Sequence, residues 1–226
     1  MCGRYNIITD AQALYDAFRV EVDLNAVPLA RYNVAPATEQ LVILEEGGRR
    51  VARWFHWGLI PHWAKDKAIA YKTINARGES VASKPAFRAA LRQRRCLVPA
   101  TGFYEWRVAD GRKQPYLIRL RNGELFSFAG LWESWAGPAG ELSSFTIITT
   151  EPNALMARIH ERMPAIVPRA QYARWLDHAL QDPAQIQPMI ASYPAAQMEA
   201  FPVGAAINNA RNQGAGLIAP TGAPLD

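Results

Sequence analysis

The chain has 226 residues, half of them apolar and a fifth charged, which is typical of a globular protein with a sizeable core. No apolar run approaches the ~18 residues of a membrane-spanning helix, and the start lacks a secretory signal, so we expect a cytoplasmic protein. The net charge of +5 is uneven: residues 1–113 hold 18 basic and 11 acidic side chains, and residues 114–226 hold 7 and 9. The basic half favours a polyanionic partner, although a solvated surface explains it equally well.

The first half of the chain predicts two helices and a hairpin. Residues 11–19 have the pattern of a short amphipathic helix, and two strands, 40–46 and 50–57, are expected to form a hairpin at Gly47-Gly48. Residues 85–95 begin with a proline that suits a helix start. On that helix, one face would carry Arg88, Arg92 and Arg95.

The second half predicts several short strands and two further helices. The strand-like runs are 96–98, 102–107, 115–120, 125–131 and 144–150, and the helical runs are 151–158 and 170–180. Because strands and helices do not alternate regularly, we predict an α+β fold with a β-rich, strongly bent mixed sheet flanked by short helices. No linker divides the chain, so residues 1–226 are expected to form a single domain and a monomer, with the Gly/Pro-rich tail from 212 loosely attached.

The two cysteines, Cys2 and Cys96, and four scattered histidines show no zinc-ligand spacing. We therefore expect neither a metal nor another cofactor. A disulfide is also not expected in a reducing compartment.

The cysteine at position 2 is the most informative residue for chemistry. Cysteine is small enough for Met1 to be removed by an aminopeptidase, which would leave a free amine and a thiol on adjacent carbons of Cys2. Such an aminothiol can capture an aldehyde as an imine and then close a five-membered thiazolidine, with the advantage of an intramolecular reaction. The α-amine has a reference pKa of about 7.7–8.0, so roughly a tenth of it is a free nucleophile at pH 7.

Six ordered blocks of sequence carry a family resemblance. They are Cys2-Gly3-Arg4-Tyr5 and residues 31–36, 57–63, 74–79, 102–106 and 160–164. A late block from Pro202 to Gly214 extends the resemblance. The set resembles the SRAP family of SOS-response-associated peptidases, also called abasic-site processing proteins. The resemblance implies an α+β domain with a basic cleft and the covalent capture of abasic sites in single-stranded DNA. It further implies a catalytic set of Cys2 as nucleophile with Asn75, Glu105 and His160.

The chemistry requires these residue types independently. An abasic sugar is mostly a closed hemiacetal, and a carboxyl group that relays protons, such as Glu105, helps to open it. Between Tyr104 and Trp106, partial desolvation is expected to raise the pKa of Glu105. Asn75 can hold the amine or the sugar by neutral hydrogen bonds, and His160 titrates in the range needed to move a proton. Each of the three also has an ordinary structural interpretation.

DNA contacts are expected from residues beside the catalytic set. Arg4, Arg77 and Arg162 are candidates for the flanking phosphates, with surface ion pairs as the alternative. Trp106 could stack on a base. Pro36 and Trp63 are candidate wedges beside the lesion, with core packing an equal interpretation. The expected partner is abasic single-stranded DNA, which would bring the protein to the nucleoid, with replication-fork proteins as a further partner class.

Two other functions remain open from the sequence. A cysteine peptidase could use Cys2, His160 and Asn75, but it needs no free terminal amine and gives no reason for the basic half. A non-covalent single-stranded DNA-binding module would use the basic residues without Cys2. A weak lyase activity and self-removal of Met1 could accompany covalent capture.

Overall fold

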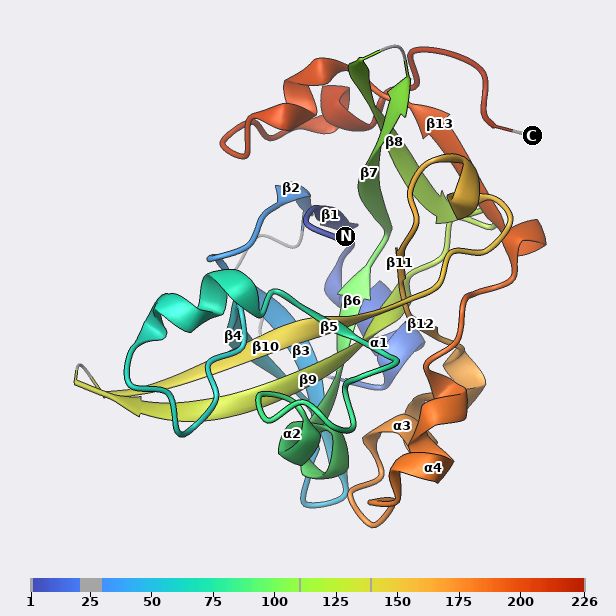
Figure 1. The fold of residues 1–226 in the computed structure, drawn as a ribbon. Helices are drawn as coiled ribbons and strands as arrows, with labels where there is room; N and C mark the ends of the chain where they lie inside the picture. Colours follow the sequence, from blue (N-terminus) through green and yellow to red (C-terminus); the bar gives the residue numbers. More distant parts are fainter. Residues whose placement is uncertain (1, 21–29, 110, 139, 226) are drawn as a thin grey trace.

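The computed structural model describes residues 2–20, 30–109, 111–138 and 140–225 (Figure 1). The strands are β1 (Tyr5–Ile8), β2 (Ala30–Val34), β3 (Glu39–Glu46), β4 (Arg49–Trp57), β5 (Asn75–Arg77), β6 (Arg95–Ala100), β7 (Gly102–Ala109), β8 (Arg112–Leu120), β9 (Phe126–Gly137), β10 (Gly140–Thr150), β11 (Met163–Pro164), β12 (Ile166–Val167) and β13 (Met198–Pro202). The α-helices are α1 (Ala11–Phe18), α2 (Arg88–Gln93), α3 (Tyr172–Leu176) and α4 (Pro183–Ile186). The 3-10 helices are η1 (Lys67–Lys72), η2 (Met156–Arg158), η3 (Arg169–Gln171), η4 (Gln187–Met189), η5 (Ala195–Gln197), η6 (Ala205–Asn208) and η7 (Ala215–Ile218).

The larger sheet closes on itself. Its strands pair in the order β11-β10-β4-β3-β6-β9-β12, and β10 also pairs with β9, so β10, β4, β3, β6 and β9 form a closed ring. Strand β10 runs parallel to β4 and β5 but antiparallel to β9 and β11. The predicted α+β class with a β-rich mixed sheet is therefore confirmed.

The smaller sheet has the order β13-β8-β7-β1-β2. Strand β6 belongs to the larger sheet and β7 to the smaller one, so the chain passes between the sheets across Thr101. The hydroxyl of Thr101 donates to the side-chain oxygen of Asn6 at 2.7 Å and accepts from the backbone of Ile8 at 3.1 Å. These bonds attach β1 to the crossover, and Figure 1 shows the chain start between the ring below and β7, β8 and β13 above.

The predicted hairpin at Gly47-Gly48 is confirmed. Strands β3 and β4 pair antiparallel from Glu39↔His56 to Glu46↔Arg49. Gly47 and Gly48 have φ values of 57° and 77°, as a two-residue turn with two left-handed positions requires.

The helix predicted for 85–95 is shorter, because α2 ends at Gln93 and Arg95 begins β6. Arg95 is 1% exposed. Its guanidinium donates to the backbone oxygens of Trp175 at 2.6 Å and Leu91 at 2.7 Å. The expectation that Arg95 shares a helical face with Arg88 and Arg92 is therefore wrong, because Arg95 lies in β6, where backbone carbonyls accept hydrogen bonds from its buried guanidinium.

Several other segments differ from the elements predicted from local sequence. The helix predicted for 151–158 is reduced to η2, and that for 170–180 is reduced to η3 and α3. The strand predicted for 125–131 continues to Gly137, because it pairs with β10 from Gly130↔Ile147 to Gly137↔Gly140. Strand β13 was not predicted, and its pairing with β8 explains why the segment is extended.

The tail beyond residue 212 is attached by several contacts, which corrects the expectation of a loose segment. The side-chain oxygen of Gln213 accepts from the backbone nitrogens of Tyr32 at 3.0 Å and Asn33 at 3.3 Å. Its nitrogen donates to the backbone oxygen of Asn33 at 3.1 Å. Leu217 is buried, and the backbone nitrogen of Leu225 donates to the oxygen of Ala200. No helix in the described ranges is long and apolar enough to cross a membrane.

Candidate functional site

Cys2 lies just before β1, and its side chain is fully buried. Burial raises the pKa of the thiol, and the negative charge of Glu105 raises it further, while a hydrogen bond from the backbone of Arg4 opposes both. Two conclusions follow. The thiol is protonated at neutral pH, and Glu105 of strand β7 lies close enough to Cys2 to affect it.

Glu105 is a buried carboxylate, only 3% exposed. Strand β7 pairs with β8, which places Glu105 opposite Tyr116 in an apolar setting. Burial raises the pKa of Glu105 to about 7, while a hydrogen bond from the backbone of Trp106 opposes the rise. The direction agrees with the sequence-based expectation. Near pH 7 Glu105 therefore populates both the protonated and the ionised form, as proton relay requires.

Glu105 opens onto a cavity of about 470 Å³ lined by Glu105, Trp106, Val108, Lys113, His160 and Asn208. Three residues predicted from the sequence, Glu105, Trp106 and His160, thus meet in one cavity. Asn208 and Lys113 were missed, and the only signal for Asn208 was its place in the late sequence block.

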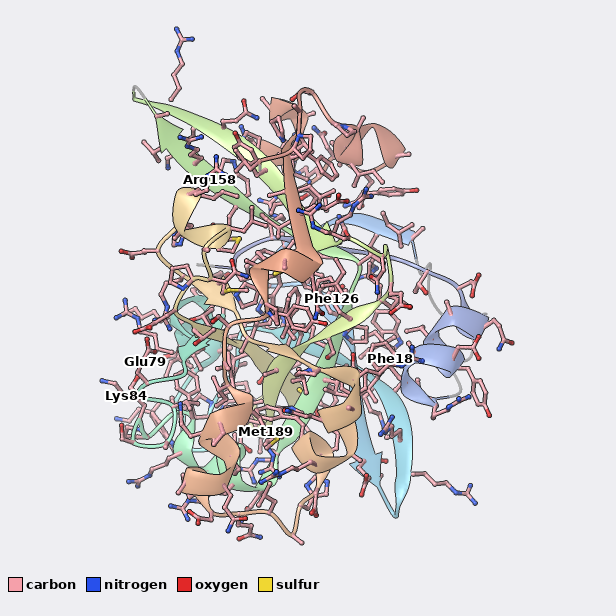
Figure 2. The ribbon with its side chains drawn as sticks, turned by 90° about the vertical axis from the view of Figure 1, so that its right-hand side faces the viewer. Phe18, Glu79, Lys84, Phe126, Arg158 and Met189 are labelled. Atoms are coloured by element: carbon pink, nitrogen blue, oxygen red, sulfur yellow. The ribbon has the colours of Figure 1, made fainter. Side chains whose placement is uncertain are left out.

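A larger hollow, of about 800 Å³, contains none of the predicted site residues. It lies between α1 and the β3–β4 hairpin and is lined by Tyr15, Arg19, Glu45, Gly48, Arg49, Arg50, Val51, Ala52 and Arg53. Figure 2 shows α1, marked by Phe18, on the opposite side of the molecule from Glu79, the residue that follows the Asn75–Arg77 strand closely. The smaller cavity is therefore the better candidate, because it contains a buried carboxyl group and a histidine within one space.

His160 follows η2 and is fixed by its neighbour. Its Nδ1 accepts a hydrogen bond from the backbone nitrogen of Arg162 at 3.0 Å. The pKa of His160 is lowered, mainly because burial disfavours the charged imidazolium. At neutral pH the imidazole is therefore uncharged, and because Nδ1 is an acceptor, its proton lies on Nε2.

Asn75 begins β5, which runs parallel to β10. Its side-chain nitrogen donates to the backbone oxygen of Ile74 at 3.0 Å, and Trp57 donates to the same oxygen at 2.9 Å. The side-chain oxygen of Asn75 is buried and has no hydrogen-bond partner within the described ranges. Of the four predicted catalytic residues, Glu105 and His160 line the cavity, whereas Cys2 and Asn75 are not among its lining residues.

The three predicted phosphate-binding arginines differ in their surroundings. Arg77 is exposed at the end of β5. Arg4 donates to the side-chain oxygen of Asn33 at 2.7 Å and to the backbone oxygen of Ile207 at 2.9 Å. Arg162 is buried; it forms a two-bond ion pair with Glu79 and donates to Thr149. Of the three, Arg77 is exposed, Arg4 is half-buried and Arg162 is buried.

The three predicted contacts for bases or the lesion are also placed differently. Trp106 lines the cavity, and its Nε1 donates to the side-chain oxygen of Asn208 at 2.8 Å. Trp63 is 52% exposed, which excludes the core-packing alternative for this side chain. Pro36 is half-buried in the turn between β2 and β3. Within the described residues no group of three or more His, Cys, Asp or Glu side chains could hold a metal ion.

Comparison with known proteins identifies the family. Residues 1–210 match the family model described as SOS response associated peptidase (SRAP). The chain belongs to the SRAP family. The resemblance seen in the sequence is therefore confirmed.

Relatives of this SRAP chain occur in bacteria and vertebrates. The abasic site processing protein YoqW of Bacillus subtilis is 41% identical over 96% of this chain and 99% of its own length. The abasic site processing protein HMCES of Xenopus tropicalis is 32% identical over 80% of this chain and 63% of its own length. A crystal structure of a protein from Bacteroides thetaiotaomicron has a TM-score of 0.85, with 27% identity over 96% of this chain and 99% of that one.

Proposed function

We propose that this SRAP protein recognises abasic sites in single-stranded DNA and forms a covalent thiazolidine with them through Cys2 after Met1 has been removed. The observation that carries the proposal is the buried Cys2 thiol within the electrostatic influence of Glu105, whose carboxyl group opens onto a cavity shared with His160. The names of the relatives, abasic site processing proteins, support the choice of substrate.

The reaction has two bond-forming steps. The α-amine of Cys2 adds to the aldehyde carbon of the opened sugar, and loss of water gives an imine. The sulfur of Cys2 then adds to the imine carbon, and the thiol proton passes to the nitrogen, which closes the thiazolidine. Glu105, with a pKa of about 7, can give a proton during ring opening and accept one from the thiol.

The electrostatics favour the order in which the amine attacks first. The amine is partly free at neutral pH, whereas burial and Glu105 keep the thiol protonated. A thiol that reacts only after the imine has formed needs no separate activation, because closure is intramolecular.

The same electrostatics argue against the peptidase alternative. A cysteine peptidase needs a thiolate before it attacks, and such thiols have a lowered pKa beside a cation. Here the largest influence on Cys2 is burial and the next is a carboxylate, and both raise the pKa. Self-removal of Met1 would account for the peptidase part of the family name without another protein substrate.

The imine also offers a second outcome. Before the sulfur adds, loss of the proton next to the imine carbon would eliminate the 3′ phosphate and nick the strand. Ring closure competes with this lyase reaction, so we expect the nicked product to increase when the thiol is removed.

One experiment separates covalent capture from both alternatives. The intact mass of the purified protein is first measured by mass spectrometry, and we expect it to lack the mass of one methionine residue. It is then incubated with an abasic single-stranded oligonucleotide and examined by denaturing electrophoresis. We expect a heat-stable adduct that Cys2→Ser abolishes and that Cys96→Ala, which removes the other buried thiol, leaves intact. An adduct of equal yield and stability from Cys2→Ser would exclude the thiazolidine, and DNA binding without any adduct would support the non-covalent module.

A further inference from the structure

The hydrogen bond between Trp106 and Asn208 fixes the orientation of the Asn208 amide. An indole Nε1 can only donate, so the Asn208 atom at 2.8 Å is the side-chain oxygen. The Asn208 nitrogen, with two donor hydrogens, is therefore the half of the amide that this bond leaves available. Because both residues line the cavity, the bond joins Trp106 of β7 to the end of η6.

Asn208 is the last residue of η6, and the coil that follows it, residues 209–214, is held against β2. Asn33 is 3% exposed, and its side-chain nitrogen donates to the backbone oxygens of Asn209 at 2.9 Å, Asn212 at 3.1 Å and Ile207 at 3.3 Å. The guanidinium of Arg4 donates to the side-chain oxygen of Asn33 and also to the oxygen of Ile207. In Figure 1 this coil lies at the top beside β7 and β8. The late sequence block thus supplies Asn208 to the cavity, and the block at 31–36 holds that late block in place through Asn33.

The donors around this wall suit an anionic oxygen. Lys113, which follows the first residue of β8, lines the same cavity as Asn208. Glu105 contributes less than a full negative charge near neutrality, because its pKa is about 7, and burial keeps His160 neutral. The ammonium group of Lys113 and the amide donor of Asn208 therefore line a cavity in which Glu105 is only partly ionised and His160 is neutral. An anionic oxygen can accept hydrogen bonds from both donors.

We propose that Asn208 is a DNA-contacting residue whose side-chain nitrogen, together with Lys113, binds a phosphodiester oxygen beside the abasic sugar. Asn33 is then a positioning residue, which holds the coil after Asn208 in place. The proposal rests on the proposed function for the identity of the neighbouring lesion, but it makes a separate claim about phosphate.

The test uses paired substitutions that separate the amide donor from the rest of the wall. Asn208→Asp keeps an oxygen for Trp106 but removes the donor and adds a negative charge. Asn122→Asp is the matched control, because Asn122 is exposed in the turn after β8, outside the cavity, and its oxygen also accepts a hydrogen bond. Lys113→Gln removes the charge alone. Affinity is measured by fluorescence anisotropy for undamaged single strands and for strands with a tetrahydrofuran analogue, which has no aldehyde, over a range of salt concentrations.

We expect Asn208→Asp to weaken binding by roughly tenfold or more, the range for losing a hydrogen bond to a charged group, and Asn122→Asp to have little effect. Lys113→Gln should lower the log–log salt slope by ~0.7. Asn208→Ala should weaken binding without changing that slope, because the lost donor is neutral. Unfolding midpoints report whether each variant is folded.

Two results would overturn the proposal. One is equal affinity of folded Asn208→Asp and Asn122→Asp. The other is a defect that changes with the base next to the lesion, since a phosphate contact is indifferent to base identity. Failure of the proposed function is recognised separately: the wild-type protein would form no adduct with natural abasic DNA, while the phosphate contact could still be measured on undamaged strands.

Discussion

Replacing Glu105 by glutamine tests the central electrostatic feature of the site. Glutamine keeps the shape and can still accept and donate hydrogen bonds, but it cannot exchange a proton. Glu105 is 3% exposed, and burial raises its pKa from the usual 4.5 to about 7. The substitution should therefore change both the free energy of unfolding and the rate of crosslinking. Each of these two effects should depend on pH in its own way, which follows from the pKa of Glu105.

The stability effect follows from the direction of the pKa shift. Because the folded-state pKa lies above the unfolded one, the contribution of Glu105 is fully present below pH 4.5 and is lost as the pH rises through about 7. At 1.36 kcal/mol for each pKa unit, the loss is about 3 kcal/mol. The difference in unfolding free energy between wild type and Glu105→Gln should shift by about this amount in favour of glutamine between pH 4.5 and pH 8. Urea unfolding of both proteins at the two pH values measures it.

The rate effect is measured by single-turnover crosslinking to natural abasic DNA. A positioned acid or base contributes ~10²–10⁴-fold, so the ratio of wild-type to Glu105→Gln rates should lie in that range below pH 7. If protonated Glu105 is the active form, the ratio should fall about tenfold per pH unit above about pH 7. The titration of the Cys2 amine affects both proteins and cancels in the ratio.

A second substrate identifies the step that Glu105 assists. An abasic analogue whose aldehyde cannot cyclise needs no ring opening, and on it the glutamine defect should shrink. A glutamine variant that matches the wild-type rate on natural abasic DNA would refute the proton-relay reasoning. A rate ratio that stays constant from pH 6 to pH 9 would do the same for the assigned pKa.

Three further predictions follow from the structure. Arg77→Ala should weaken binding to single strands of any sequence and lower the log–log salt slope by ~0.7, as measured by anisotropy. The control is Arg92→Ala, because Arg92 is also exposed, and an unchanged slope would show that Arg77 does not contact phosphate. His160→Ala should slow single-turnover crosslinking on the order of 10²-fold without changing affinity for the tetrahydrofuran analogue; an equal loss of affinity would indicate a binding role. Gly130→Ala should lower the unfolding free energy by about 1–3 kcal/mol, because its new methyl group would meet the sulfur of Cys96 at 2.7 Å. If urea unfolding showed the same stability as the wild type, the core around Cys96 would have rearranged to accept the methyl group, contrary to this prediction.

Local sequence was sufficient where structure depends on neighbouring residues. The β3–β4 hairpin was predicted because its two glycines permit the turn and its strands pair with each other. The raised pKa of Glu105 was predicted because its neighbours along the strand, Tyr104 and Trp106, are bulky aromatic residues. The aminothiol chemistry that we propose for Cys2 likewise came from its place next to Met1 in the sequence.

The sequence could not show which distant groups would share a space. Arg95 was expected on a helical face with Arg88 and Arg92, yet its guanidinium donates to carbonyls from two separate segments. Arg162 was expected to be open to phosphate, yet Glu79, 83 positions away, occupies its donors.

The cavity itself is the clearest product of the tertiary structure. Glu105 comes from β7, His160 from the segment after η2, and Asn208 from the end of η6. The side chain of Asn33 holds the next residue, Asn209, which is 176 positions away in the sequence. No local pattern encodes such contacts, because a side-chain amide has the same propensities whether it faces solvent or three backbone carbonyls of a distant segment. Sequence determined which chemical groups this protein carries and the pairing of adjacent strands; the closure of the β-ring and the passage of the chain into the second sheet decided which of those groups meet.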